Sequence, residues 1–151
     1  MGRVINVDST GAQRSRLRRT IAECLNRLMA KPELDAEAKD IASLIVLALR
    51  EITDGVAQSA DVWDKRGYYL KSDALRNDWD WADRTADRMA NLIRVGDWAR
   101  LPVVLATLVP RFSDVDVVKL TRSASLWRGA YARLIEDEKK RRGAAEQGAR
   151  P

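Results

Sequence analysis

The sequence contains no histidine and only one cysteine, Cys24. Without histidine, the chain cannot form a Ser-His-Asp triad, a Cys-His nucleophile pair, a histidine-ligated zinc site or a Glu-x-x-His di-iron centre. A single thiol excludes an internal disulfide and a thiolate cluster. These absences favour a cytoplasmic protein over a disulfide-stabilised secreted one.

Glycine-rich phosphate-binding motifs and long apolar runs are also missing. Neither Gly-x-x-x-x-Gly-Lys nor Gly-x-Gly-x-x-Gly occurs, so the chain lacks both standard phosphate cradles. The longest apolar run, residues 41–49, is interrupted by Ser43, whereas a spanning helix needs about 20 residues. The first twelve residues are polar and lack the apolar core of a signal peptide. We therefore expect no cofactor and no membrane partner.

The apolar residues that are present follow a helical pattern. Five segments repeat them at the 3.6-residue spacing of an amphipathic helix; they lie at about residues 13–30, 36–66, 72–94, 98–110 and 126–142. The second is apolar on all sides over 41–49, which indicates a helix surrounded by protein. The pattern predicts an all-α protein, a compact bundle of four to five helices around a long central helix.

Two other features complete the predicted architecture. The β-branched stretches Arg3–Val7 and Val115–Leu120 do not follow the helical period and are candidates for a minor two-stranded ribbon. Residues 143–151 are rich in small and polar side chains and are predicted to form a flexible polar tail. At 151 residues, the rest of the chain, 1–142, is predicted to be a single helical domain.

The chain is basic, with a net charge of +5 and a pI of about 9.7, but the charge is uneven. Residues 1–31 carry seven Lys or Arg against two acids, whereas 32–96 carry nine against thirteen. This asymmetry indicates either attraction of an external polyanion or attraction between the two parts.

The arginine-rich start of the first predicted helix is a candidate anion or nucleic-acid site. On a helical wheel, Arg14 and Arg18 fall inside the apolar arc, while Arg16 and Arg19 fall on the solvent side. A buried guanidinium needs a partner. We therefore expect Arg14 and Arg18 to pair with acids of the middle segment such as Asp61 or Asp64, with an anion site as the alternative.

The solvent-side arginines carry the nucleic-acid alternative. Arg16 and Arg19 are positioned to contact phosphates, for which arginine is well suited. No helix-turn-helix, RNP or zinc-finger pattern accompanies them. Such binding is therefore expected to be independent of sequence. The second basic run, 139–142, ends the last predicted helix, where cations complement the helix dipole.

A carboxylate-metal hydrolase is the second alternative. Asp80, Asp83 and Asp87 share one helix face, and Glu51 and Asp54 are similarly spaced on the preceding helix. Carboxylate oxygens are the ligands that Mg²⁺ prefers in proteins. However, three arginines interleave with these acids at helical spacing, which is typical of a solvated ion-pair face.

Five tryptophans are many for this length, and one differs from the others. Trp63, Trp79 and Trp127 lie on apolar stripes and are expected in the core. Trp81 lies about 100° from the seam of its helix, so it either broadens the buried face or marks a partner contact. Together these patterns favour a non-catalytic helical interaction or assembly module that binds a protein partner or a second copy of itself.

Overall fold

The computed structural model describes residues 7–117 and 123–149, and these ranges contain helices but no β-strand. The five α-helices and two short 3₁₀ helices are, in chain order, α1 (Val7–Met29), α2 (Ala36–Lys65), α3 (Tyr69–Val95), α4 (Leu101–Leu108), η1 (Val109–Phe112), η2 (Ala124–Leu126) and α5 (Ala130–Ala149). The predicted all-α architecture is confirmed.

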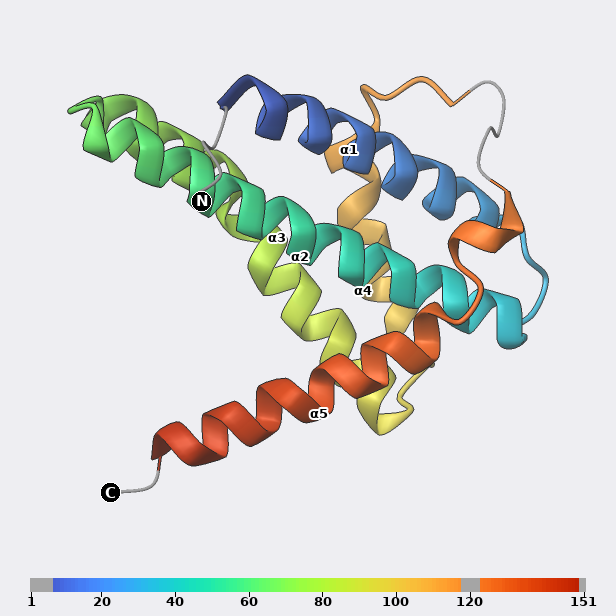
Figure 1. Cartoon of the computed structure of the whole chain (residues 1–151). Helices are drawn as coiled ribbons and strands as arrows, with labels where there is room; N and C mark the ends of the chain where they lie inside the picture. Colours follow the sequence, from blue (N-terminus) through green and yellow to red (C-terminus); the bar gives the residue numbers. More distant parts are fainter. Residues whose placement is uncertain (1–6, 118–122, 150–151) are drawn as a thin grey trace.

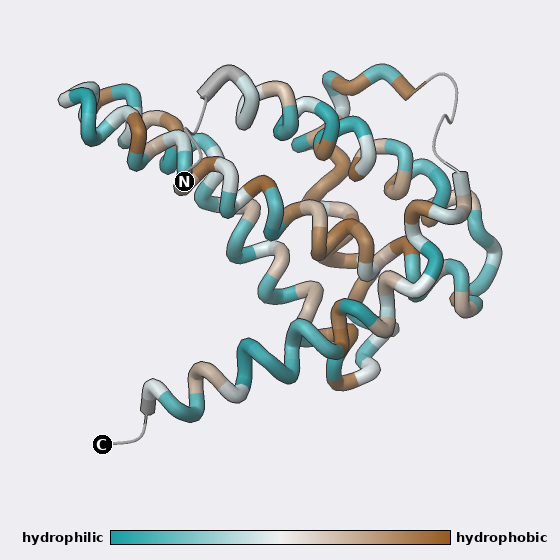
Figure 2. The backbone as a smooth tube through the Cα atoms, in the orientation of Figure 1, coloured by the Kyte–Doolittle hydropathy of each residue, from teal (hydrophilic) through white to brown (hydrophobic). Residues whose placement is uncertain are grey.

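Helix α2 is the centre of the molecule and packs against α1, α3 and α5 (Figure 1). Its inward positions are spaced three or four residues apart, and the side chains there are almost completely buried: Ile41, Ile45, Leu49 and Ile52. Figure 2 shows the most hydrophobic stretches of backbone in the interior, on α2 and α4. The prediction of a long central helix is therefore confirmed.

Local signals in the sequence explain where α2 begins. The carboxylate of Asp35 accepts a hydrogen bond of 2.8 Å from the backbone N–H of Ala38. This satisfies one of the amides that every helix start leaves without a partner in the helix. Pro32, which lacks an N–H, lies in the connection after α1.

A glycine turn joins α2 to α3 and shortens their connection to residues 66–68. Gly67 has a φ of 80°, a left-handed conformation that favours glycine. Its N–H donates to the carbonyl of Asp64, and the N–H of Tyr68 donates to the carbonyl of Trp63 at 2.8 Å. These are the two bonds of a Schellman motif. Helix α3 consequently begins at Tyr69, three residues before its predicted start.

The fourth helix differs from the prediction at both ends. Gly96 ends α3 with a φ of 75°, as its position suggested, but α4 begins only at Leu101. Residues 98–100 form a turn before it, and 3₁₀ geometry follows at its end, in η1, which contains Pro110. Proline removes a backbone donor, so the regular α-helix ends before it.

The last helix is also displaced from its predicted bounds. It begins at Ala130 and continues to Ala149, so most of the segment predicted as a loose tail is helical. Its start is held by Asp40 of α2, whose carboxylate accepts hydrogen bonds from the backbone amides of Gly129 (3.2 Å) and Tyr131 (2.9 Å).

The predicted ribbon falls largely on residues 1–6 and 118–122, which lie outside the described ranges. Of its remaining residues, Val7 begins α1 and 115–117 contain no strand.

Candidate functional site

Arg14, on α1, lies against an aromatic ring instead of pairing with the acids proposed from the sequence. Its guanidinium carbon is 5.8 Å from the centre of the Trp79 ring on α3. Asp61 and Asp64 both pair with Arg76, at 3.4 and 2.7 Å. The Nη1 atom of Arg14 is buried without a hydrogen-bond partner, and burial lowers the pKa of this arginine.

Arg18 is an anchor between α1 and the segment around η1. Its Nη2 atom is 2.5 Å from a carboxylate oxygen of Asp114 and donates to the carbonyl of Arg111 at 3.2 Å. It also lies 5.7 Å from the centre of the Phe112 ring. The hydrogen bond from Arg18 lowers the pKa of Asp114. Arg18 therefore pairs with an acid, but one that follows η1, not one of the middle segment.

The two arginines placed on the solvent side have different surroundings. Arg16 is exposed, and its side chain makes no ion pair within the described part of the chain. Arg19 is only partly exposed, and its Nε atom lies 3.3 Å from the carboxylate of Glu23, a side chain that is 2% exposed. Of the four arginines, Arg16 alone resembles a freely available phosphate contact.

Trp81 belongs to a cluster that joins α1, α3 and η1. Its ring stacks on Trp79 with 5.6 Å between centroids and meets the edge of Phe112 at 5.9 Å. The guanidinium of Arg111 lies 4.6 Å from the Trp81 ring centre, and the indole N–H donates to the carbonyl of Asp78. Trp81 is partly buried and packs against the core, so it broadens the buried face of α3. We call this set the arginine–aromatic cluster: Arg14, Arg18, Arg111, Trp79, Trp81 and Phe112.

The acids considered as metal ligands are dispersed among arginines. Asp80 pairs with Arg84 one turn along α3, and Asp87 lies 3.4 Å from Arg50 of α2. Within 7–117 and 123–149, no three His, Cys, Asp or Glu residues converge on a point where they could hold a metal ion. The arrangement resembles the ion-pair face more than a metal centre.

Arg50 is the centre of a second charged cluster, at the junction of α2, α3 and α5. Its side chain is 7% exposed and lies close to three carboxylates. Nη1 is 3.0 Å from Asp137 and 2.7 Å from Glu138, while Nη2 approaches Asp87. Arg141 pairs with the same Asp137 at 2.9 Å. These ion pairs connect α2, α3 and α5, although Nε of Arg50 and Oε1 of Glu138 are buried without a hydrogen-bond partner.

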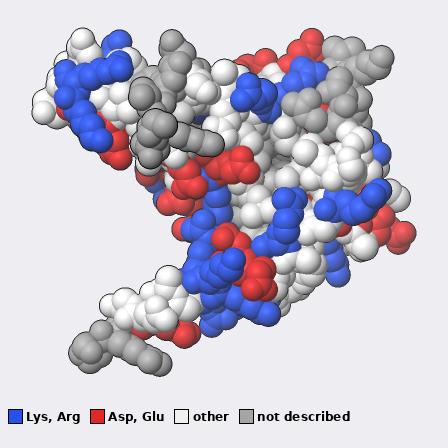
Figure 3. All heavy atoms as spheres, viewed as in Figure 1, with Lys and Arg blue, Asp and Glu red and all other residues white. Residues whose placement is uncertain are grey.

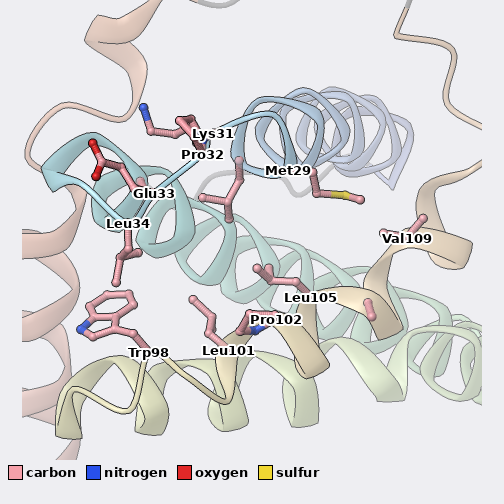
Figure 4. Close-up of a pocket in the computed structure, with 13 residues that line it drawn as sticks. Met29, Lys31, Pro32, Glu33, Leu34, Trp98, Leu101, Pro102, Leu105 and Val109 are labelled. Atoms are coloured by element: carbon pink, nitrogen blue, oxygen red, sulfur yellow. The ribbon is translucent and has the colours of Figure 1, made fainter.

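An open apolar groove lies between the end of α1, the start of α2 and the whole of α4 (Figure 4). Its volume is about 410 Å³. Side chains from three α-helices, their connections and η1 line it: Leu28, Met29, Lys31, Pro32, Glu33, Leu34, Ala38, Trp98, Leu101, Pro102, Leu105, Ala106 and Val109. Met29, Leu34 and Val109 are exposed to solvent. Solvent-exposed apolar side chains that line a concave site are typical of a binding groove.

Of the two charged residues that line the groove, Lys31 is paired, whereas the exposed Glu33 makes no ion pair within the described residues. Lys31 pairs with Asp35 at 3.0 Å and with Glu37 at 2.9 Å. Hydrogen bonds to these carboxylates, chiefly to Glu37, raise the pKa of Lys31. The ammonium of Lys39 lies 5.4 Å from the Trp98 ring centre. The groove therefore offers a partner its apolar lining and one exposed carboxylate, that of Glu33.

The groove was not identified from the sequence, although part of it leaves a signal. Leu101, Leu105 and Val109 are four residues apart, so they form a ridge along α4 and η1. Leu34, which forms the opposite wall (Figure 4), comes from an irregular connection that carries no periodicity.

Comparisons of the chain with protein-family models, with curated proteins and with solved structures found no match. Among the described helices, none is long and apolar enough to cross a membrane. A function for this protein must therefore be argued from its own surfaces.

Proposed function

We propose that this protein is a non-catalytic interaction module that binds an apolar helical segment of a partner protein in the groove between α1, α2 and α4. The observation that carries this proposal is the groove itself, which exposes Met29, Leu34 and Val109 around a cavity of about 410 Å³. Covering these side chains would remove apolar surface from water, which is the main driving force of association.

The shape and chemistry of the groove favour a helix as the occupant. Amphipathic helices bind by placing apolar residues at positions i, i+3, i+4 and i+7 into such grooves. The volume lies in the range of small binding sites, about 300–1,000 Å³. It has room for a few large side chains between Leu34 on one wall and the Leu101–Leu105 ridge on the other.

The proposal is tested by selecting helical peptides from a displayed library on the wild-type protein. Leu34→Glu and Val109→Glu each place a carboxylate against the apolar lining, and both residues are exposed, so folding should be retained. We expect selected peptides to lose about tenfold or more in affinity for each variant, since a buried unpaired charge is costly. Val103→Glu changes another exposed apolar residue, one that does not line the groove, and is the control.

Two outcomes would contradict the proposal. One is a selection that yields no peptide; the other is a set of peptides that bind the two groove variants as tightly as the control. Sedimentation of the protein alone tests whether a second copy of the chain occupies the groove. In that case association depends on protein concentration and is abolished by Leu34→Glu.

A further inference from the structure

The free end of the α2–α3 hairpin combines exposed aromatic and aliphatic side chains with cations. We call residues 65–71, Lys-Arg-Gly-Tyr-Tyr-Leu-Lys, the hairpin tip; it contains three cations and no acid. Leu70 is 88% exposed and Tyr69 is 63% exposed, among the most exposed large hydrophobic residues described. In Figure 1 the tip projects beyond the start of α1, and Figure 3 shows Lys and Arg atoms gathered at this end. It lies apart from the apolar groove, none of whose lining residues belongs to it.

The tip is held rigidly despite its exposure. The Schellman bonds of Gly67 and Tyr68 close the turn, and the Tyr68 ring meets Trp63 edge-on with 5.7 Å between centroids. The ammonium of Lys71 lies 4.7 Å from the centre of the Trp63 ring and 5.8 Å from that of Tyr68. A surface fixed in this way loses little conformational entropy when it binds.

The positive charge of the tip is not neutralised by its neighbours. Lys65, Arg66 and Lys71 make no ion pair within the described residues. The acids on the adjoining turns, Asp61, Asp64 and Asp73, are all engaged by Arg76. One arginine serves three carboxylates there, so the flanks at 61–64 and 72–76 carry a net charge of −2 against +3 at the tip. The hairpin end as a whole is positive, and its unpaired cations lie at the tip.

We propose that the hairpin tip binds the surface of a membrane that contains anionic phospholipids. Leu70 and Tyr69 enter the region between headgroups and acyl chains, while the three cations contact headgroup phosphates. Tyrosine is enriched at this interface because its ring is apolar and its hydroxyl polar. Neighbouring Lys and Arg add attraction to an anionic leaflet. The expectation of no membrane partner rested on the lack of a spanning helix, which a peripheral contact does not need.

The geometry favours a lipid surface over a nucleic acid. Single strands are bound along charged grooves in which bases stack on open aromatic faces. The tip is instead the projecting end of a helical hairpin (Figure 1), and Lys71 already lies over the ring of Trp63. Its most exposed side chain, Leu70, is aliphatic and gains most by leaving water.

The first test measures sedimentation of the full chain with vesicles. We expect binding to phosphatidylcholine–phosphatidylglycerol vesicles at low salt, and much weaker binding to phosphatidylcholine alone. Lys65→Gln and Arg66→Gln should each weaken binding about fivefold, because each removes the attraction of one cation to the anionic surface. Leu70→Ser should weaken it on the order of tenfold, from the apolar burial of one leucine. Lys139→Gln, which removes an exposed cation of α5, is the charge-matched control and should change little.

The second test reports whether Leu70 enters the lipid. The Leu70→Cys variant is labelled with a thiol-reactive, polarity-sensitive nitrobenzoxadiazole dye. Because Cys24 is buried, the dye should react selectively with the new cysteine at position 70. Its emission should shift to the blue with anionic vesicles and not with single-stranded DNA. The same dye at Val103→Cys, a 67% exposed site on α4, should not shift.

Three results would overturn the proposal. The first is that the protein does not bind anionic vesicles at low salt. The second is that Lys139→Gln weakens vesicle binding as much as the tip variants do. The third is that the tip binds DNA while the protein binds no vesicles.

Discussion

The guanidinium of Arg50 lies 2.7 Å from the carboxylate of Glu138, where α5 meets the central helix. Both side chains are largely buried, and Asp137 lies 3.0 Å from the same nitrogen. Taking such charges out of water is costly, so each depends on its partners to be tolerated there. The position of α5 is thus fixed by a buried ion cluster as well as by its apolar residues Ala130 and Leu134.

Replacing Arg50 by alanine should strongly destabilise the protein. The change leaves the largely buried Glu138 without its cation, while Asp137 keeps only Arg141, and a loss of about 3–5 kcal/mol is expected. Arg84→Ala removes a cation from an exposed pair with Asp80 and should cost only about 0–1 kcal/mol. Urea denaturation of both variants checks the difference, and similar losses would show that the Arg50 cluster does not hold α5.

Arg14 and Arg18 should respond in opposite ways to replacement by methionine. Arg14→Met removes a buried nitrogen without a partner while keeping the apolar bulk against Trp79, so stability should be unchanged or higher. Arg18→Met breaks the pair with Asp114 and should cost about 1 kcal/mol, since that pair is partly exposed. Thermal unfolding of the two variants is the measurement. A clear loss of stability in Arg14→Met would indicate that this guanidinium has a favourable partner in solution.

Binding of polyanions through α1 should depend mainly on Arg16. Arg19 is paired with Glu23 and Arg18 with Asp114, so Arg16 is the arginine of this group left available. If α1 binds DNA, Arg16→Ala should flatten the dependence of affinity on salt by about one unit, whereas Arg18→Ala should have little effect. Wild-type protein that fails to bind DNA at about 50 mM salt would exclude this alternative function.

Acid should destabilise the protein mainly below about pH 4, the ordinary range of aspartate. Hydrogen bonds from Arg76 and Ser72 lower the pKa of Asp64, and Arg18 lowers that of Asp114. A depressed folded-state pKa adds stability above the unfolded-state pKa, which is lost as pH falls through the folded value. With no histidine, stability should be nearly constant between about pH 5 and 8. Urea denaturation midpoints measured as a function of pH test this expectation. In acid, the midpoint of Asp64→Asn should fall less steeply with decreasing pH than that of the wild type.

The helices were predictable because their signals are local. Ile41, Ile45 and Ile52 follow the helical period on α2, and the caps at Asp35 and Gly96 act within a few residues. The boundaries that failed depend on distant contacts or on turn geometry. The start of α5 is held by Asp40, which is about ninety residues away in the sequence, so no local pattern reveals it.

The candidate sites were less predictable than the fold for the same reason. The helical wheel placed Arg14 and Arg18 correctly on the inner face of α1, but their neighbours Trp79 and Asp114 come from other elements. Residues 65–71 did carry a usable signal, a glycine between two long helical patterns and beside two tyrosines. Most of it falls between the predicted helices 36–66 and 72–94, so no helical period indicates which way its apolar side chains face.

The three-residue connection between α2 and α3 has a consequence for how the chain folds. These two helices share the broadest packing in the molecule, and they are adjacent in the sequence, so bringing them together costs little loop entropy. Helix α5, by contrast, contacts α2 through residues about ninety positions apart in the sequence, such as Asp40 and Tyr131. Contacts close in sequence form fastest, which makes the hairpin the expected folding nucleus. Its exposed end would then be the first finished surface of the protein, present before α5 has docked.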